Sequence, residues 1–287
     1  MRTLFRLPRR ARGAVLVAAL AFFPAAIPAQ ETAPAPGAAE TFEDISFVWC
    51  PAGTFLQGGE LTPQETVTLV RGREEWYADE HPAHEVTLGE GFWISRMEIT
   101  RAQWSKVMGS RPWGGEADAD QTQDLVLPAT HVSWKDANLF VAALNKLGRG
   151  TFSLPTEAQW EYACRAGTTT PYFFGQDAAA MGDFAWYREN TQAVKEMWPH
   201  QVASKQANAW GIYDLLGNVE EWCLDFYAPY AGAAGTDPAG PERGDYAVVR
   251  GGAYHTFPAY LRSASRSSLR TDVAREYTGF RIVRRRS

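Results

Sequence analysis

The sequence predicts a mixed α+β domain with two amphipathic helices and a long, loop-rich second half. Hydroxyl residues followed three positions later by a polar residue mark helix starts in the first half. Short apolar segments between glycine-rich turns are typical of strands. The 11 tryptophans and 25 glycines among 287 residues indicate an irregular backbone around a sizeable core. The chain has no repeat of fixed period, which argues against a propeller or a solenoid.

The first 29 residues have the pattern of a secretory signal peptide. Five arginines precede the apolar stretch 14–27, and small residues end it before Gln30. We expect cleavage after Ala29, a periplasmic or secreted location, and no membrane span afterwards, because the apolar run is short and interrupted by prolines. Arg9-Arg10 also permits twin-arginine export, so the export route stays open.

A Pro/Ala-rich linker over residues 30–41 is expected before a single domain over 42–287. Without the leader, 23 basic side chains (28 less the five arginines) face 33 acidic ones, a net charge of −10. A chain this acidic argues against nucleic-acid binding, which needs clustered Lys and Arg.

The first half predicts four strands and three helix starts. Residues 45–57 indicate two strands around a Pro-Ala-Gly turn, and residues 84–100 indicate two more around Gly89-Glu90-Gly91. The N-cap pairs are Thr100 with Gln103, Ser133 with Asp136, and Thr156 with Gln159.

The second and third of these helices carry an apolar face. After Ser133 that face consists of Ala137, Phe140, Val141 and Leu144, and Gly148 closes the helix. The third helix places Trp160 and Cys164 one turn apart and ends at Gly167. From about residue 168 onward the helical signal disappears, and short aromatic segments alternate with turns.

Seven segments resemble the sulfatase-modifying factor, or formylglycine-generating enzyme, family. They are FVWCPAGTFLQGG, GFWISRMEIT, PATHVSWKDANLF, FSLPTEAQWEYACRAG, NAWGIYDLLGNVEEW, VVRGGAYH and GFRIVR, in family order over residues 45–284. The resemblance implies a single domain with a C-type-lectin-like topology.

The resemblance also implies a calcium site in YDLLGNVEEW. The ligands there are the side chains of Asp214 and Glu221 and the backbone carbonyls of Gly217 and Val219. Mixed carbonyl and carboxylate oxygens suit this hard cation. The alternative is a turn that its own hydrogen bonds stabilise. The family's second calcium loop has no clear match in this chain.

The family's catalytic copper site is missing. Formylglycine-generating enzymes oxidise a substrate cysteine with copper held by two cysteines after the RGG motif, and thiolates suit Cu(I). The matching segment here, RGGAYHTFPAYLRSASRSS, contains no cysteine, and the first copper position falls near Thr256. We therefore expect that the known copper route is lost, and the identity of any redox metal stays open.

Four residues near this segment are candidate site residues. His255, beside the lost copper position, is the candidate catalytic or metal-binding residue. Tyr254, Arg266 and Tyr277 are candidates for substrate binding, with Tyr277 at a position where the family uses an asparagine to hold peptide. A structural role is the alternative for His255 and Arg266.

Two functions of different classes remain open. The first is oxidative tailoring of a peptide or peptide-derived substrate, as implied by copper-cysteine-lacking relatives such as the periplasmic pyoverdine-maturation type. The second is a non-catalytic, calcium-braced module that binds peptide or glycan through aromatic loops. Formylglycine formation on sulfatases by unusual ligands is a third interpretation. Substrate, oligomeric state and any pairing among Cys50, Cys164 and Cys223 stay open.

Overall fold

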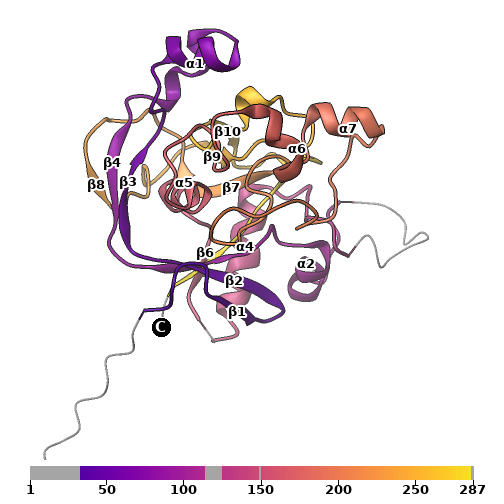
Figure 1. Ribbon diagram of the computed structural model, residues 1–287. Helices are drawn as coiled ribbons and strands as arrows, with labels where there is room; N and C mark the ends of the chain where they lie inside the picture. Colours follow the sequence, from indigo (N-terminus) through magenta and orange to yellow (C-terminus); the bar gives the residue numbers. More distant parts are fainter. Residues whose placement is uncertain (1–32, 114–124, 149, 286–287) are drawn as a thin grey trace, which may run out of the picture. The chain divides into compact units, whose positions relative to one another are not determined.

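The computed structural model describes residues 33–113, 125–148 and 150–285, which form three β-sheets with helices packed against them (Figure 1). The predicted signal peptide and the start of the linker lie outside the described residues. All described residues fall within one unit, Ala33–Ser287. No helix in the described ranges is both long and apolar enough to cross a membrane.

The largest sheet has five antiparallel strands and joins the two ends of the domain. Its order is β1 (Ala39–Phe42), β2 (Ile45–Cys50), β5 (Phe92–Ser95), β12 (Val283–Arg285) and β6 (Phe152–Ser153).

The domain contains two smaller sheets. The four-stranded sheet has the order β10 (Arg266–Arg270), β9 (Tyr246–Arg250), β7 (Glu220–Phe226) and β11 (Thr278–Gly279), and β11 runs parallel to β7. The three-stranded sheet contains β3 (Gly53–Gln57), β4 (His84–Leu88) and β8 (Gly235–Thr236). Figure 1 shows the β3–β4 pair extending towards helix α1.

The helices are short. They are α1 (Pro63–Val70), α2 (Arg101–Met108), α4 (Trp134–Asn145), α5 (Glu157–Arg165), α6 (Met181–Phe184) and α7 (Arg188–Val194). Four 3₁₀ turns complete the set: η1 (Glu74–Trp76), η2 (Ala78–Glu80), η3 (Ala178–Ala180) and η4 (Pro258–Tyr260).

The three predicted helix starts are confirmed as reciprocal capping boxes. The hydroxyls of Thr100, Ser133 and Thr156 each accept a hydrogen bond from the backbone N–H three residues on, at 3.1–3.2 Å. The predicted apolar face of α4 is also buried.

Two expectations were wrong. The folded part begins before residue 42, because Ala39–Phe42 pairs with β2 and satisfies its backbone hydrogen bonds in the sheet despite its linker-like composition. Helices also occur outside the predicted ones, at α1, α6 and α7. Tertiary contacts stabilise α7, whose Thr191 hydroxyl donates to the carbonyl of Tyr254 at 2.9 Å.

Two apolar clusters form the core. One surrounds α5 and includes Trp160 and Cys164; the other packs α2 and α4 on the sheets through Trp104, Phe140 and Phe280. Trp104 stacks on Phe140 at 5.6 Å, and both meet the edge of Phe280. Because α5 also contacts β3, β7 and β9, it holds the two smaller sheets together.

The turn before β7 requires glycine at position 217. Gly217 has φ +81°, and a Cβ there would lie 2.0 Å from the carbonyl oxygen of Trp186. We predict that Gly217→Ala lowers the free energy of unfolding by about 3 kcal/mol or more, through both strain and overpacking.

Gly109→Ala is the matched control, because Gly109 has φ +64° and no atom within 4 Å of the added Cβ. It should cost only about 1 kcal/mol. Chemical denaturation of both variants measures the difference, and equal losses would show that the contact with Trp186 does not matter.

Candidate functional site

Helix α5 carries charged residues on a buried face. Glu157, Glu161 and Arg165 follow one another at four-residue intervals, so they line one side of the helix. All three side chains are at most 6% exposed. Charges this deeply buried are tolerated only when they are paired and hydrogen-bonded.

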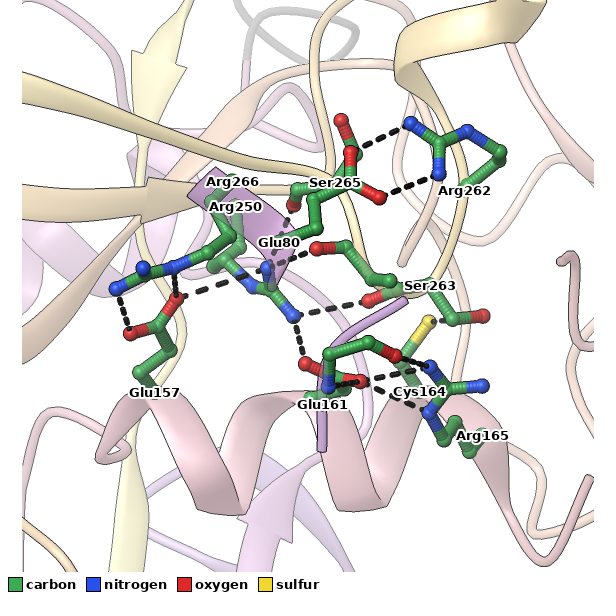
Figure 2. Close-up of polar contacts among 12 residues, drawn as sticks. Glu80, Glu157, Glu161, Cys164, Arg165, Arg250, Arg262, Ser263, Ser265 and Arg266 are labelled. Atoms are coloured by element: carbon green, nitrogen blue, oxygen red, sulfur yellow. Dashed lines mark hydrogen bonds and ion pairs between the residues drawn. The ribbon is translucent and has the colours of Figure 1, made fainter. Parts of the chain in front are cut away.

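Arg250, at the end of β9, is the centre of the ion network that pairs them (Figure 2). Its Nη2 donates to Glu161 Oε2 at 2.5 Å. The guanidinium also donates to three consecutive carbonyls, those of Ser263, Ala264 and Ser265, at 2.7–2.9 Å. Arg250 therefore fixes the backbone of residues 263–265 against α5.

Two further arginines of the same segment are paired in the same way. Arg266 forms a two-pronged pair with Glu157 at 2.6 and 2.7 Å, and its guanidinium lies 3.7 Å from the centre of the Tyr230 ring. Arg262 pairs with both oxygens of Glu80 at 2.5 Å. Figure 2 shows these pairs side by side with the Arg250 contacts.

The pairing decides the charge state of Glu161. Burial acts to raise the pKa of this carboxyl, but Arg165 and Arg250 outweigh it and lower the pKa below its ordinary value. Glu161 therefore stays ionised at neutral pH. The charged groups of the network are paired with one another, and Arg250 and Arg266 also form part of a cavity wall.

A cavity of about 540 Å³ lies over this network. Gly251 and Gly252 of the RGG motif line it together with Thr256, near which the resemblance placed the first copper position. Its other walls are Glu75, Trp76, Asp79, Glu220, Tyr227, Val249, Arg250, Tyr260, Ser265, Arg266 and Ser267.

Three of the four predicted site residues gather next to this cavity. The His255 ring lies 5.0 Å from that of Tyr254 and 4.4 Å from that of Tyr277, edge to face with both. Burial, followed by Arg188, lowers the pKa of His255, so its imidazole is neutral at pH 7. Its Nδ1 has no hydrogen-bond partner among the described residues. The fourth, Arg266, lies in the cavity wall and pairs with Glu157.

The predicted calcium residues do not line this cavity. Glu221 accepts from Arg281 with both oxygens at 2.6 Å and from Trp160 Nε1 at 2.7 Å. Asp214, with φ +55°, accepts from the backbone N–H of Ala203 at 2.6 Å. Glu98, which the sequence did not single out, bonds Asn218 and the N–H of Val219 close by.

Charge in this second region suits a cation. Glu98, Asp214 and Glu221 are all buried; Arg281 forms an ion pair with Glu221 and acts to lower the pKa of the other two carboxyls. Burial raises the pKa of Asp214 to about 6 and that of Glu98 well above its ordinary value, with neighbouring carboxylates adding to both. Within the described residues, no three His, Cys, Asp or Glu side chains converge to hold a metal ion. The predicted set combines two carboxylates with two carbonyls, the donor types that calcium takes, but both oxygens of Glu221 already accept from Arg281.

The three cysteines are free, buried and inert. Burial raises the pKa of Cys164 to about 11 and those of Cys50 and Cys223 well above their ordinary value. None of them lines the cavity beside Gly251 and Gly252. A buried thiol with a raised pKa supplies neither the thiolate that binds copper nor a nucleophile.

Sequence reasoning missed most of the ion network. The four-residue spacing of Glu157, Glu161 and Arg165 was a visible signal, but it is also typical of an exposed helix face. Glu80 and Arg262 are 182 positions apart, and no local pattern connects them. Trp76 enters the cavity from a segment with no motif of its own, and Glu220 lies in the YDLLGNVEEW motif but was not among the predicted site residues.

Comparisons with known proteins agree on one family. The family described as Sulfatase-modifying factor enzyme 1-like domain matches residues 32–286. The chain is 33% identical over 208 residues to the formylglycine-generating enzyme of Streptomyces coelicolor, covering 68% of this chain and 61% of that protein. It is 26% identical over 255 residues to the serine/threonine-protein kinase pkn1 of Chlamydia caviae, covering 80% and 37%. The chain thus spans less than two thirds of these relatives' length.

Solved structures confirm the predicted α+β fold. Treponema denticola variable protein 1 matches with a TM-score of 0.72 at 23% identity, covering 87% of this chain and 99% of that one. PvdO from Pseudomonas aeruginosa matches with a TM-score of 0.70 at 25% identity, covering 88% and 100%. The fold is therefore a single domain of the type predicted from the seven sequence segments.

Breaking the ion network should destabilise the domain strongly. Glu161→Gln leaves Arg250 and Arg165 without their shared carboxylate, and we predict a loss of about 3–5 kcal/mol in the free energy of unfolding. Asp272→Asn is the control, since its pair with Arg270 is solvent-exposed and contributes little to stability. Denaturant titration of both variants checks this, and similar losses would contradict a structural role for the network.

Proposed function

Because the chain belongs to the sulfatase-modifying factor enzyme 1-like family, we propose that it is an exported protein that binds a peptide or peptide-derived substrate in the cavity beside Gly251 and Gly252 for oxidative tailoring. One observation carries the proposal: Thr256, near which the resemblance places the first copper position, lines a cavity of about 540 Å³. A cavity at this position supports a substrate site that lacks the copper thiolates.

The walls suit a peptide-like molecule. Tyr260, Trp76 and Tyr227 offer ring surface with few rotatable bonds, and Glu220 and Asp79 offer hydrogen-bond acceptors. The Thr256 hydroxyl already accepts from the N–H of Ala253 at 2.9 Å, which fixes the loop that would face the substrate. Among the described residues no metal-binding cluster of three side chains supplies an oxidant, so we derive no step through a metal.

The second candidate is a non-catalytic module that binds peptide or glycan in the same cavity, favoured by the aromatic side chains that line it. The two functions differ in whether the bound molecule leaves changed. Formylglycine formation through this chain's own thiols gains no support, since all three cysteines are buried with raised pKa values.

Filling the cavity tests the tailoring function. Ser267 is exposed in the cavity wall, so Ser267→Trp should block the space without unfolding the domain. We predict that a deletion strain of the source organism accumulates a peptide-derived compound that is less oxidised than its wild-type counterpart, as seen by mass spectrometry of extracts. Wild-type protein should restore the product, and Ser267→Trp should not.

Glu85→Trp, on the exposed face of strand β4, is the control and should restore the product fully. Restoration by Ser267→Trp would show that the cavity is not used. Accumulation of the same compounds in deleted and wild-type strains would favour the binding module.

We also propose a structural calcium ion at Asp214, Gly217, Val219 and Glu221. At about a hundredfold excess over its Kd, such an ion adds about 2.7 kcal/mol of stability. The melting temperature of purified protein should therefore fall by about 5–10 °C when a chelator removes calcium. Asp214→Ala should abolish this difference, because it removes the side-chain oxygens, whereas Asp272→Ala should keep it. A melting temperature unaffected by chelator would contradict the site and support a turn stabilised by its own hydrogen bonds.

A further inference from the structure

The cavity beside Gly251 and Gly252 continues into a second one. A neighbouring cavity of about 500 Å³ shares Trp76 and Tyr260 with it and is lined mainly by apolar and aromatic residues. Tyr77, Tyr172 and Phe257 belong to this second cavity. The two spaces therefore offer a polar compartment and an aromatic compartment that meet at Trp76 and Tyr260.

The charges of the polar compartment do not balance. Its two guanidiniums, those of Arg250 and Arg266, are paired from behind with Glu161, which Arg165 shares, and with Glu157; neither glutamate lines the compartment. Its three carboxylates are those of Glu75, Asp79 and Glu220, and none of them forms an ion pair within the described ranges. The compartment thus presents uncompensated negative charge to an occupant.

Glu220 is a cavity-lining carboxylate whose surroundings shift its pKa. Burial raises its pKa, and Thr278 and Arg275 offset this only in part. The Arg275 guanidinium donates to Tyr277 Oη at 3.0 Å instead of pairing with Glu220. A cation arriving from outside would therefore meet an unpaired carboxylate.

Aromatic rings add to this preference for a cation. Trp76 is 49% exposed, and its ring centre lies 6.0 Å from that of Tyr260. Ring faces attract cations, most strongly where water is partly excluded. The chain uses the same contact internally, since the Arg73 guanidinium lies 5.7 Å from the Trp76 ring.

The wall also contains an unsatisfied donor. Arg250, which lines the cavity and is 1% exposed, has no acceptor for its Nε–H within the described residues. Buried donors without partners are rare in folded proteins. Peptide carbonyls are acceptors of the kind that this donor lacks.

The hydrogen bonds of the carboxylates favour an ammonium over a guanidinium. Asp79 already uses Oδ2 to accept from the Tyr227 hydroxyl at 2.9 Å, and Glu220 uses Oε1 to accept from Thr278 Oγ1 at 2.6 Å. A guanidinium binds best to both oxygens of one carboxylate. Single oxygens from several directions suit the three N–H donors of an ammonium.

We propose that the polar compartment binds a positively charged ammonium group of the peptide or peptide-derived substrate, with the neighbouring side chain or ring against Trp76 and Tyr260. This inference rests on the proposed function, because it assigns a charge to the molecule that the cavity accepts. Glu220 and Asp79 hold the ammonium, and Trp76 covers it.

Four short peptides test the inference. The probes are N-acetyl, C-amide tripeptides Ala-X-Ala in which X is lysine, Nε-acetyl-lysine, norleucine or arginine. Binding is followed by the NMR signals of the indole N–H groups, with the Trp76 signal assigned through Trp76→Phe. We expect the lysine peptide to shift the Trp76 signal and to bind at least about tenfold more tightly than the acetyl-lysine and norleucine peptides.

Two variants test whether Glu220 binds the ammonium group. Glu220→Gln should weaken binding of the lysine peptide by about tenfold and leave binding of the norleucine peptide unchanged. Glu85→Gln, which removes a carboxylate from exposed strand β4 outside the cavity, should change neither.

Three other outcomes would each refute a different proposal. Equal affinity for lysine and norleucine peptides would refute the ammonium inference while keeping the cavity as a binding site. Tighter binding of the arginine peptide than of the lysine peptide would refute the choice of ammonium. If no peptide shifts the Trp76 signal, both this inference and the proposed binding function fail.

Discussion

The buried contact between Arg250 and Glu161 is the interaction on which the functional surface depends. A carboxylate on α5 and a guanidinium on β9 neutralise each other where water is excluded, and the same guanidinium bonds three consecutive carbonyls of residues 263–265. Such a pair stabilises a structure only when nearly every donor and acceptor finds a partner. Because Arg250 directly precedes Gly251 and Gly252, this contact also positions the glycines that line the cavity.

The residues that shape the cavity differ from the cysteines that hold copper in the family. The ion network shapes the cavity from behind through Arg250 and Arg266, and neither residue depends on the copper cysteines. Thr256, near which the family resemblance places the first copper position, is one of the residues that line the cavity. The carboxylates that face inward, Glu220 and Asp79, are free to select a ligand by charge. Asp214 and Glu221, two of the residues of the proposed calcium site, do not line the cavity.

Sequence patterns predicted what local physics decides. Hydroxyl caps at Thr100, Ser133 and Thr156 and the apolar face of α4 are short-range features, and the structure contains all of them. Residues 39–42 and α7 were missed because sheet pairing and tertiary hydrogen bonds, which leave no local signature, order them. The pairing of Glu80 with Arg262 crosses 182 positions and could not be deduced from spacing. The candidate residues Tyr254, His255 and Tyr277 were found through motif resemblance, whereas Trp76 and Glu220 required the fold.

Amide hydrogen exchange on Arg250→Lys is the most direct test of the central claim that Arg250 fixes the cavity wall. Lysine retains the charge for Glu161 but lacks the fork that bonds three carbonyls at once. In Arg250→Lys we predict faster amide exchange at residues 263–267 and at the glycine loop 251–256, whereas the protection of the α4 amides should stay unchanged. Unaltered exchange in these two segments, or a uniform loss across the chain, would contradict it.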